Sequence, residues 1–117
     1  MIKRILDDLV AEGLGVQAAI FLDGEGETIV QSGERNFDVQ LIGAWKEIQL
    51  DRIKDISNRL KLGEVRAVLF TLDQGKELVI PVEDEYCLVL LLSVYADFRD
   101  ALNGAGRAVE RLKKDIS

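Results

Sequence analysis

The longest periodic pattern of hydrophobic and polar positions covers residues 37–62 and predicts a long helix. On a helical wheel that advances about 100° per residue, its apolar side chains form one arc over roughly half of the circumference. A surface helix needs an apolar stripe only somewhat wider than ~100°. The arc consists of Phe37, Leu41, Ile42, Ala44, Trp45, Ile48, Ile53, Ile56 and Leu60, with Val39 and Leu50 on one flank. We therefore expect one sheet to cover part of this apolar arc and a partner to contact the rest.

The opposite side of the same helix is polar. It consists of Gln40, Gly43, Glu47, Asp51, Lys54, Asn58 and Lys61. A mixed-charge helical surface suits transient recognition, in which electrostatics governs association rate and specificity more than affinity. We predict that a partner binds this face through Glu47, Asp51, Lys54, Asn58 and Lys61. The alternative explanation of the same pattern is that the polar side of the helix is simply solvated. Trp45, inside the apolar arc, has two readings as well, core packing or an interface anchor.

Two shorter helices and five strands are predicted around the long helix. The helices cover residues 2–11 and about 96–115, with Asp97 as a cap, and Asn36 can cap the long helix, which Gly63 ends. The strands cover residues 16–22, 27–32, 65–72, 77–82 and 86–94. Asp-Gly and a second Gly at residues 23–26 supply the first hairpin turn. Pro81 limits ladder pairing near the end of the fourth strand.

The sheet order follows from which strands are apolar on both faces. Residues 86–94 meet that condition for most of their length, so this strand is central. The meander places residues 77–82 beside it and residues 65–72 beyond, and the first hairpin adds on the free side through residues 16–22. The prediction is an α+β fold of profilin type in one domain, residues 1–117: three α/β/α layers around a five-stranded antiparallel sheet of order 2-1-5-4-3.

The third strand would lie at an edge, and its composition is unusual for an edge. Residues 65–72 contain one charge and no proline, and an open apolar edge is an association site. Together with the wide apolar arc, this edge predicts a homodimer. The predicted dimer interface consists of Val39, Leu50, Ile53, Val65, Ala67, Leu69 and Thr71.

Composition narrows the class of protein. The chain has 117 residues, a net charge of −6 and a pI of about 4.7. Lysine and arginine are interspersed with acids, which argues against nucleic acid and against anionic membrane surfaces as partners. The start is not a signal peptide, and the longest apolar run, residues 86–92, is too short to span a bilayer. We therefore expect a cytoplasmic protein.

The sequence offers little chemistry. It has no histidine, and its one cysteine, Cys87, lies in the most apolar strand, where a packed thiol is favoured over a reactive one. The acids of residues 23–27 resemble the start of a calcium loop, but Thr28 stands where that loop needs glycine. Gly24 and Gly26 precede a strand, not the helix of a dinucleotide site. We expect no metal, no cofactor and no enzymatic activity; Arg35 and Arg52 are the only arginines considered as a catalytic finger, and solvation is favoured for both.

Two segments resemble the Roadblock/dynein light-chain family, which includes the bacterial MglB-like regulators. They are GVQAAIFLD at residues 15–23 with Gly26 in the turn, and YCLVLLL at residues 86–92 followed by Ala96, Asp97 and Phe98. The element order extends the resemblance over the whole chain. It implies a dimer with a continuous ten-stranded sheet and paired long helices. It also implies a Ras-like small GTPase, or dynein in eukaryotes, as partner.

Two functions from different classes follow. The first is a dimeric module that regulates or scaffolds a Ras-like small GTPase. The alternative is a profilin-like sensory domain that holds a small ligand between sheet and helices, as PAS and GAF domains do. A sensor needs convergent polar groups in a pocket, and the predicted core positions are nearly all aliphatic. The sequence therefore favours the binding module.

Overall fold

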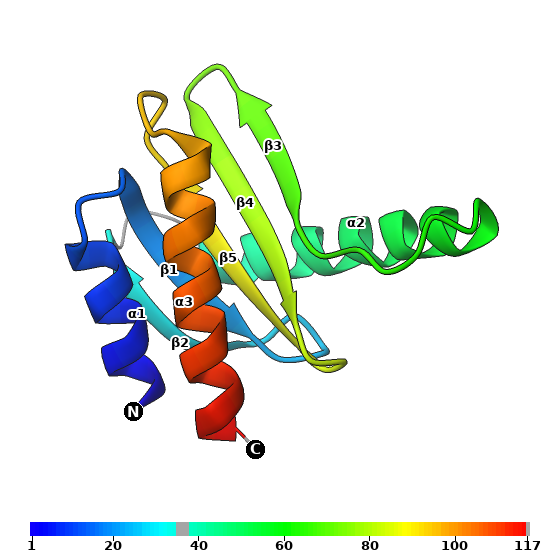
Figure 1. Ribbon diagram of the computed structural model, residues 1–117, viewed down its shortest axis with the longest axis horizontal. Helices are drawn as coiled ribbons and strands as arrows, with labels where there is room; N and C mark the ends of the chain where they lie inside the picture. Colours follow the sequence, from blue (N-terminus) through cyan, green and yellow to red (C-terminus); the bar gives the residue numbers. More distant parts are fainter. Residues whose placement is uncertain (35–37, 117) are drawn as a thin grey trace.

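The computed structural model describes residues 1–34 and 38–116, without the side chains of residues 39–41 and 44–47 (Figure 1). The helices are α1 (Ile2–Ala11), α2 (Val39–Arg59) and α3 (Phe98–Ile116). The strands are β1 (Val16–Leu22), β2 (Thr28–Gly33), β3 (Val68–Leu72), β4 (Gly75–Val82) and β5 (Tyr86–Leu92). Asn36, the predicted cap of the long helix, lies outside the described residues. Asp97 is confirmed as the N-cap of α3, because its carboxylate accepts a hydrogen bond from the N–H of Arg99 at 2.8 Å.

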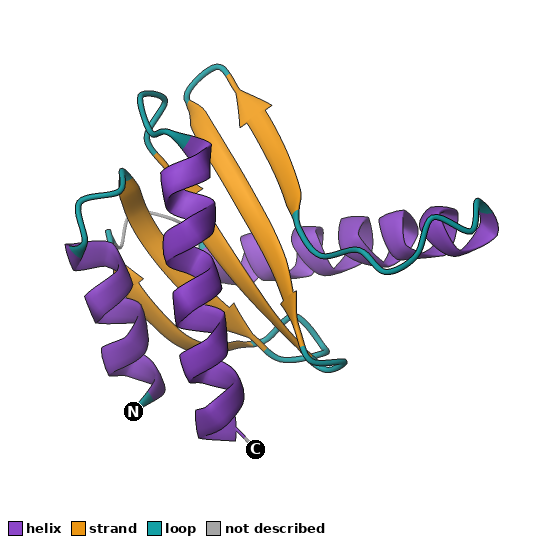
Figure 2. Cartoon of the chain, in the orientation of Figure 1, coloured by secondary structure: helices purple, strands orange, loops and turns teal. Residues whose placement is uncertain are grey.

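The five strands form one antiparallel sheet in the order β2-β1-β5-β4-β3, as predicted. Helices α1 and α3 cover one face of the sheet and α2 crosses the other, so the three-layer arrangement is confirmed (Figure 2). β1 and β5 lie in the middle, and nearly all of their side chains are buried. The apolar character of both faces of these two strands is therefore explained by their central position.

The face under α1 and α3 holds the larger core. Phe21 stacks on Tyr86 with ring centroids 5.3 Å apart, and α3 places small buried residues, such as Ala101 and Ala105, against the sheet. Gly104 has a local reason to be glycine, because a Cβ there would collide with the side chain of Leu14. This close packing holds α1 and α3 in one layer.

The third strand is shorter than predicted, which corrects the sequence-based boundary. β3 begins at Val68, opposite Val79, and Val65 and Ala67 precede the strand. Continuing the register would place residue 66 opposite Pro81, which has no backbone N–H to donate. The ladder therefore ends at Val68, and the last residues of β4 have no partner strand on that side.

The long helix ends without the help of Gly63, another correction. Lys61 adopts a left-handed conformation with φ of 57°. Its N–H donates a hydrogen bond to the carbonyl oxygen of Asn58 at 3.2 Å, and the N–H of Leu62 donates one to the carbonyl oxygen of Ser57 at 3.0 Å. These two bonds form a Schellman motif, in which glycine is usual but not required. Gly63, with φ of 94°, follows in the loop.

Gly43 is buried, although the sequence pattern places it on the polar side of the long helix. A Cβ at this position would collide with the carbonyl oxygen of Gly26 and would lie 3.2 Å from the side chain of Leu22. Gly43 therefore sits where α2 crosses the turn between β1 and β2. The reason for glycine here is the close approach of two backbones, which no periodicity reveals.

We expect Gly43→Ala to lower the free energy of unfolding by about 1–3 kcal/mol, because backbone and not a flexible side chain must move. Gly106→Ala is the matched control in α3, since a Cβ at that position meets no atom within 4 Å. The control should raise the free energy of unfolding by up to ~1 kcal/mol through helix propensity. Urea denaturation measures both, and an unchanged Gly43→Ala protein would contradict the contact.

Helix α1 is tied to strand β2 by a polar contact. The carboxylate of Asp7 accepts hydrogen bonds from the ammonium of Lys3, at 2.7 Å, and from the hydroxyl of the buried Ser32. Both bonds, that of Lys3 more strongly, hold the pKa of Asp7 below its ordinary value of 3.8. The ionised form of Asp7 is therefore the one that stabilises the fold.

This lowered pKa predicts an acid-sensitive contribution to stability. Because the folded pKa of Asp7 lies below 3.8, its contribution is present above about pH 4 and is lost as the pH falls through the folded value. Asp7→Asn should therefore be less stable than the wild type at about pH 7, and the difference should shrink below about pH 4. Unfolding measured across this range checks the expectation, and a difference that is the same at every pH would refute it.

Candidate protein-binding surface

Helix α2 contacts the sheet through one flank only. Leu50 is 4% exposed and packs with Ile42 against a core that includes Val79, Val89 and Leu91. Beyond that contact the helix projects past β3, the last strand on this side (Figure 1). Among the described side chains of α2, Leu50 and Gly43 are buried, and they set the side of the helix that faces the sheet.

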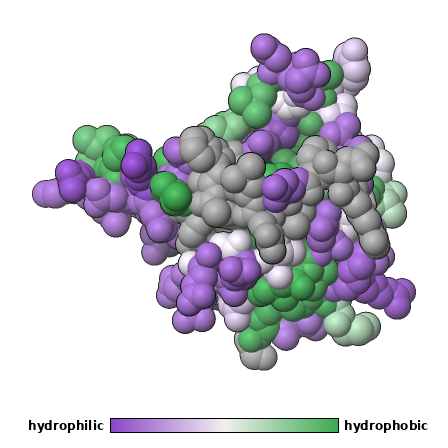
Figure 3. Space-filling view, turned by 180° about the vertical axis from the view of Figure 1, so that it is seen from behind, coloured by the Kyte–Doolittle hydropathy of each residue, from purple (hydrophilic) through white to green (hydrophobic). Residues whose placement is uncertain are grey.

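Three described apolar side chains of the arc point away from this contact. Ile48 is 53% exposed, Ile56 is 55% exposed and Leu60 is 62% exposed. On a helical wheel Ile56 lies about 120° from Leu50, and Ile48 lies about 160° from it on the other side. Seen from behind, the projecting end of α2 shows apolar atoms between hydrophilic ones (Figure 3). The helix therefore uses the flank of its apolar arc against the sheet and leaves Ile48, Ile56 and Leu60 uncovered by this chain.

The edge strand β3 adds exposed apolar side chains on both faces of the sheet, since Leu72 lies on the α2 face and Leu69 on the face of α1 and α3. Leu69 is 36% exposed and Leu72 is 51% exposed, while Val68 and Phe70 pack toward α2. The gap between α2 and this part of the sheet, beside Ile53, has no room for a water molecule. We call the exposed side chains of Ile48, Ile56, Leu60, Leu69 and Leu72 the apolar edge.

The predicted interface residues fall into three groups. Ala67, Leu69 and Thr71 are exposed at or before β3, and Ile53 and Val65 are half-buried beside them. Leu50 is buried inside the chain, so it supports the helix and offers no surface of its own. Val39, Trp45 and Glu47 lie in α2, but the structure does not describe their side chains. Arg35 lies outside the described residues.

The predicted partner-binding residues differ in their exposure to solvent. Asp51, Asn58 and Lys61 are exposed, as is Arg52, and Lys54 is half-buried. Lys54 and Asn58 also line a cleft of about 930 Å³ that the sequence did not predict. Its other lining residues include Glu64, Ala67, Ile80, Pro81, Glu83, Asp84, Leu102, Gly106, Val109, Glu110 and Lys113. Residues from four elements meet here, so only the tertiary fold assembles this cleft.

No protein-family model matches the sequence, and no curated protein matches it either. Solved structures match its fold closely. Myxococcus xanthus MglB has 14% identity and a TM-score of 0.91, covering 98% of this chain and 94% of that protein. A Roadblock/LC7 domain from Streptomyces avermitilis has 18% identity and a TM-score of 0.89, covering 97% and 96%.

The chain has the Roadblock/MglB fold. A structure described as MglB with tetrameric arrangement also matches, with 14% identity and a TM-score of 0.88 over 97% of this chain and 85% of that one. A profilin from Acanthamoeba castellanii matches less closely, with 14% identity and a TM-score of 0.71 over the full length of both chains. The predicted resemblance and the profilin type of the sheet are thus both confirmed.

This Roadblock/MglB fold gathers no metal-binding or membrane-spanning feature in its described part. No group of three or more Cys, Asp or Glu residues among residues 1–34 and 38–116 could hold a metal ion. Asp23 instead accepts the N–H groups of Glu25 and Glu27 and so closes its own turn. No described helix is long and apolar enough to cross a membrane. The described residues leave three surfaces open to a partner: the apolar edge, the polar side of α2 and the cleft.

Proposed function

We propose that this chain is a non-enzymatic cytoplasmic binding module, which dimerises through its apolar edge and regulates or scaffolds a Ras-like small GTPase. The observation that supports it most strongly is the outward orientation of the apolar arc on α2. Single exposed apolar residues are common, but several of them on one helix and on the adjoining edge strand are typical of an interaction site.

A second copy of the chain fits the apolar edge better than an unrelated protein. β3 carries unpaired backbone groups along its outer side, and the same strand of another copy satisfies them by symmetric pairing. Each projecting α2 would then lie beside the partner's sheet and helix, where Ile48, Ile56 and Leu60 lose their contact with water. The proposed interface thus keeps Ile53, Val65, Ala67, Leu69 and Thr71, and Val39 with them. A stable interface of this kind buries roughly 1,500 Å² or more.

The partnership with a small GTPase rests on the resemblance to Roadblock and MglB-like proteins together with the fold. The surface proposed for it is the polar side of α2, formed by Glu47, Asp51, Lys54, Asn58 and Lys61. Asp51, Asn58 and Lys61 are exposed in the chain, and a dimer built on the apolar arc leaves that side in water. Mixed charges there favour a fast and selective encounter.

The alternative, a small-ligand sensor, finds less support. A PAS-like or GAF-like site would occupy the space between sheet and helix, yet the gap beside Leu50 and Ile53 is filled. The large cleft lies instead at the open end of β4, and charged residues border it. Small-ligand pockets are mostly apolar with a few converging polar groups.

The dimer predicts that thermal stability depends on protein concentration. Association with a second copy stabilises the folded state by mass action, so the melting temperature of the wild type should rise with concentration. Ile56→Asp places a charge in the interface and should abolish this rise. Ile29→Asp is the matched control, because Ile29 is 43% exposed on the opposite edge strand. Equal concentration dependence in all three proteins would argue against the interface.

The GTPase partnership predicts binding that depends on the nucleotide. Each Ras-like GTPase of the source organism, loaded with GDP or with a non-hydrolysable GTP analogue, is titrated against the dimer. Asp51→Lys combined with Lys61→Glu should weaken binding at least tenfold, since like charges now face each other, with dimerisation unchanged. Arg52→Ala should slow hydrolysis far less than the ~10³-fold loss expected for a catalytic finger. The proposal fails if no such GTPase binds in either nucleotide state.

A further inference from the structure

The cleft runs along α3, on the side of that helix away from α1. Leu102, Gly106 and Val109 recur at helical spacing and form one wall, and residues 63–67 form the other. Ile80 and Pro81, at the unpaired end of β4, form the floor. Between Leu102 and Lys113 α3 rises about 17 Å. The cleft is therefore long enough to lie against about three turns of another helix.

Gly106 leaves a gap in the wall of this cleft that nothing in the described chain fills. A Cβ at Gly106 would meet no atom within 4 Å, whereas at Gly104, on the inner side of α3, it would collide with Leu14. Glycine within a helix costs about 1 kcal/mol relative to alanine. Gly104 thus has a packing reason inside the chain, whereas Gly106 leaves room for the close approach of a backbone from outside.

The charged side chains around the cleft are unpaired within the described residues. None of Lys54, Glu64, Arg66, Glu83, Asp84, Glu110 and Lys113 forms an ion pair or a side-chain hydrogen bond there. The α1 side of the same helix differs, because Arg107 pairs with Glu12 at 2.7 Å and Arg111 pairs with Asp8 at 3.1 Å.

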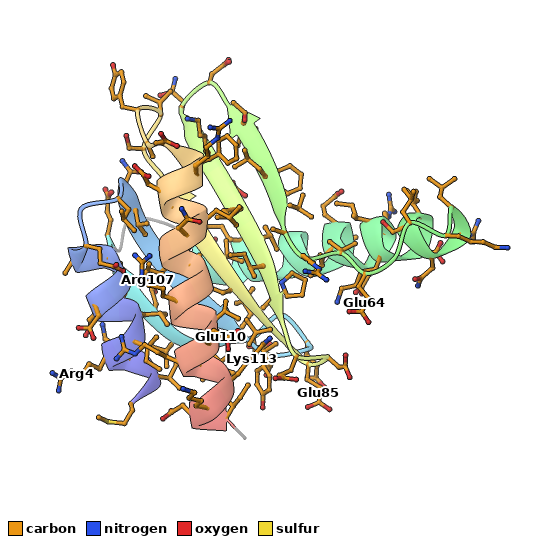
Figure 4. The ribbon with its side chains drawn as sticks, in the orientation of Figure 1. Arg4, Glu64, Glu85, Arg107, Glu110 and Lys113 are labelled. Atoms are coloured by element: carbon orange, nitrogen blue, oxygen red, sulfur yellow. The ribbon has the colours of Figure 1, made fainter. Side chains whose placement is uncertain are left out.

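Two acidic residues of the cleft lie next to each other at one end of it. Glu83 and Asp84 lie in the turn that closes it, and Glu85 follows in that turn (Figure 4). Figure 4 also shows Glu110 and Lys113 on the lower half of α3, and Glu64 beside the projecting part of α2. An occupant that is basic at the end beside the turn is therefore complementary in charge.

A helix fits this cleft better than an added strand. A peptide that extends a sheet needs alternating donors and acceptors along the edge it joins. The open end of β4 contains Pro81, which has no N–H. The same proline that ends β3 at Val68 thus disfavours a foreign strand at this place.

We propose that the cleft binds an amphipathic helix of a partner protein. The apolar face of this helix packs on Leu102, the exposed apolar side chain of the wall, over the buried Val109 and Ile80, and approaches α3 at Gly106. Its basic end lies beside Glu83 and Asp84. The site is centred on α3 and the end of β4, and Lys54 and Asn58 of α2 border it. Asp51 and Lys61, which are changed in the test of GTPase binding, do not line the cleft, so the two tests act on different residues.

The test uses a fluorescent peptide of about 18 residues, long enough to be helical alone, built from alanine with a leucine stripe and lysines at one end. A second peptide carries glutamates in place of the lysines. The wild type should bind the lysine peptide more tightly than the glutamate peptide. Gly106→Leu fills the gap and should weaken binding of the lysine peptide at least tenfold. Asn103→Leu, at an exposed position of α3 outside the cleft, should change it less than twofold.

Replacement of both Glu83 and Asp84 by lysine should reverse the preference between the two peptides. Circular dichroism and thermal unfolding confirm that each variant is folded. The proposal is wrong if neither peptide binds, if Gly106→Leu binds the lysine peptide like the wild type, or if Gly106→Leu breaks the dimer, because a second copy would then occupy the cleft. Failure here leaves GTPase binding intact, so the two proposals are separable.

Discussion

The structure depends on how one long helix rests on the sheet. α2 contacts the sheet through the flank that contains Leu50 and Gly43, and a backbone collision at Gly43 prevents any larger residue there. That flank contact fixes the rotation of the helix. Once the rotation is fixed, Ile48 and Ile56 must face outward, and the hydrophobic free energy of covering them is available only through association. The rotation of one helix thus connects the fold to the proposed function.

A second constraint comes from one proline at the edge of the sheet. Pro81 disfavours a second strand beside the last residues of β4 on the side away from β5, so β3 is short and that side of β4 is open. The short strand β3 leaves a pairing edge for a second copy. The open end of β4 leaves a cleft beside α3. The two surfaces for which different partners are proposed therefore lie at the same edge of the sheet.

Much of the fold could be predicted from the sequence because periodicity reports burial directly. The strands that are apolar on both faces, β1 and β5, are central, and the turn at residues 23–26 is where glycine and aspartate place it. The same logic explains how a chain with 14% identity to MglB keeps a TM-score of 0.91. Binary pattern and turn chemistry tolerate wide exchange of side chains.

The surfaces were harder to predict, because they depend on distances between elements. The helical wheel of the long helix shows an apolar arc wider than one sheet can cover. It does not show which part of the helix contacts the sheet, and in the structure this is the flank that contains Leu50. It placed Gly43 among polar residues because glycine has no side chain to classify. The cleft is lined by residues of α2, β4, α3 and the segment before β3, so no local sequence pattern predicts it. Gly106 lies in the wall of the cleft, but the sequence alone does not show this. Only the fold shows that a Cβ at this position would meet no described atom within 4 Å.

The central claim is that the outward apolar arc of α2 is covered by a second copy of the chain. Sedimentation equilibrium of the unmodified protein, from about 1 μM upward, measures this directly. The account predicts a mass of twice the 13.0 kDa of one chain throughout that range. A single species of 13.0 kDa at the highest concentration would contradict it, because the apolar edge would then be stable in water.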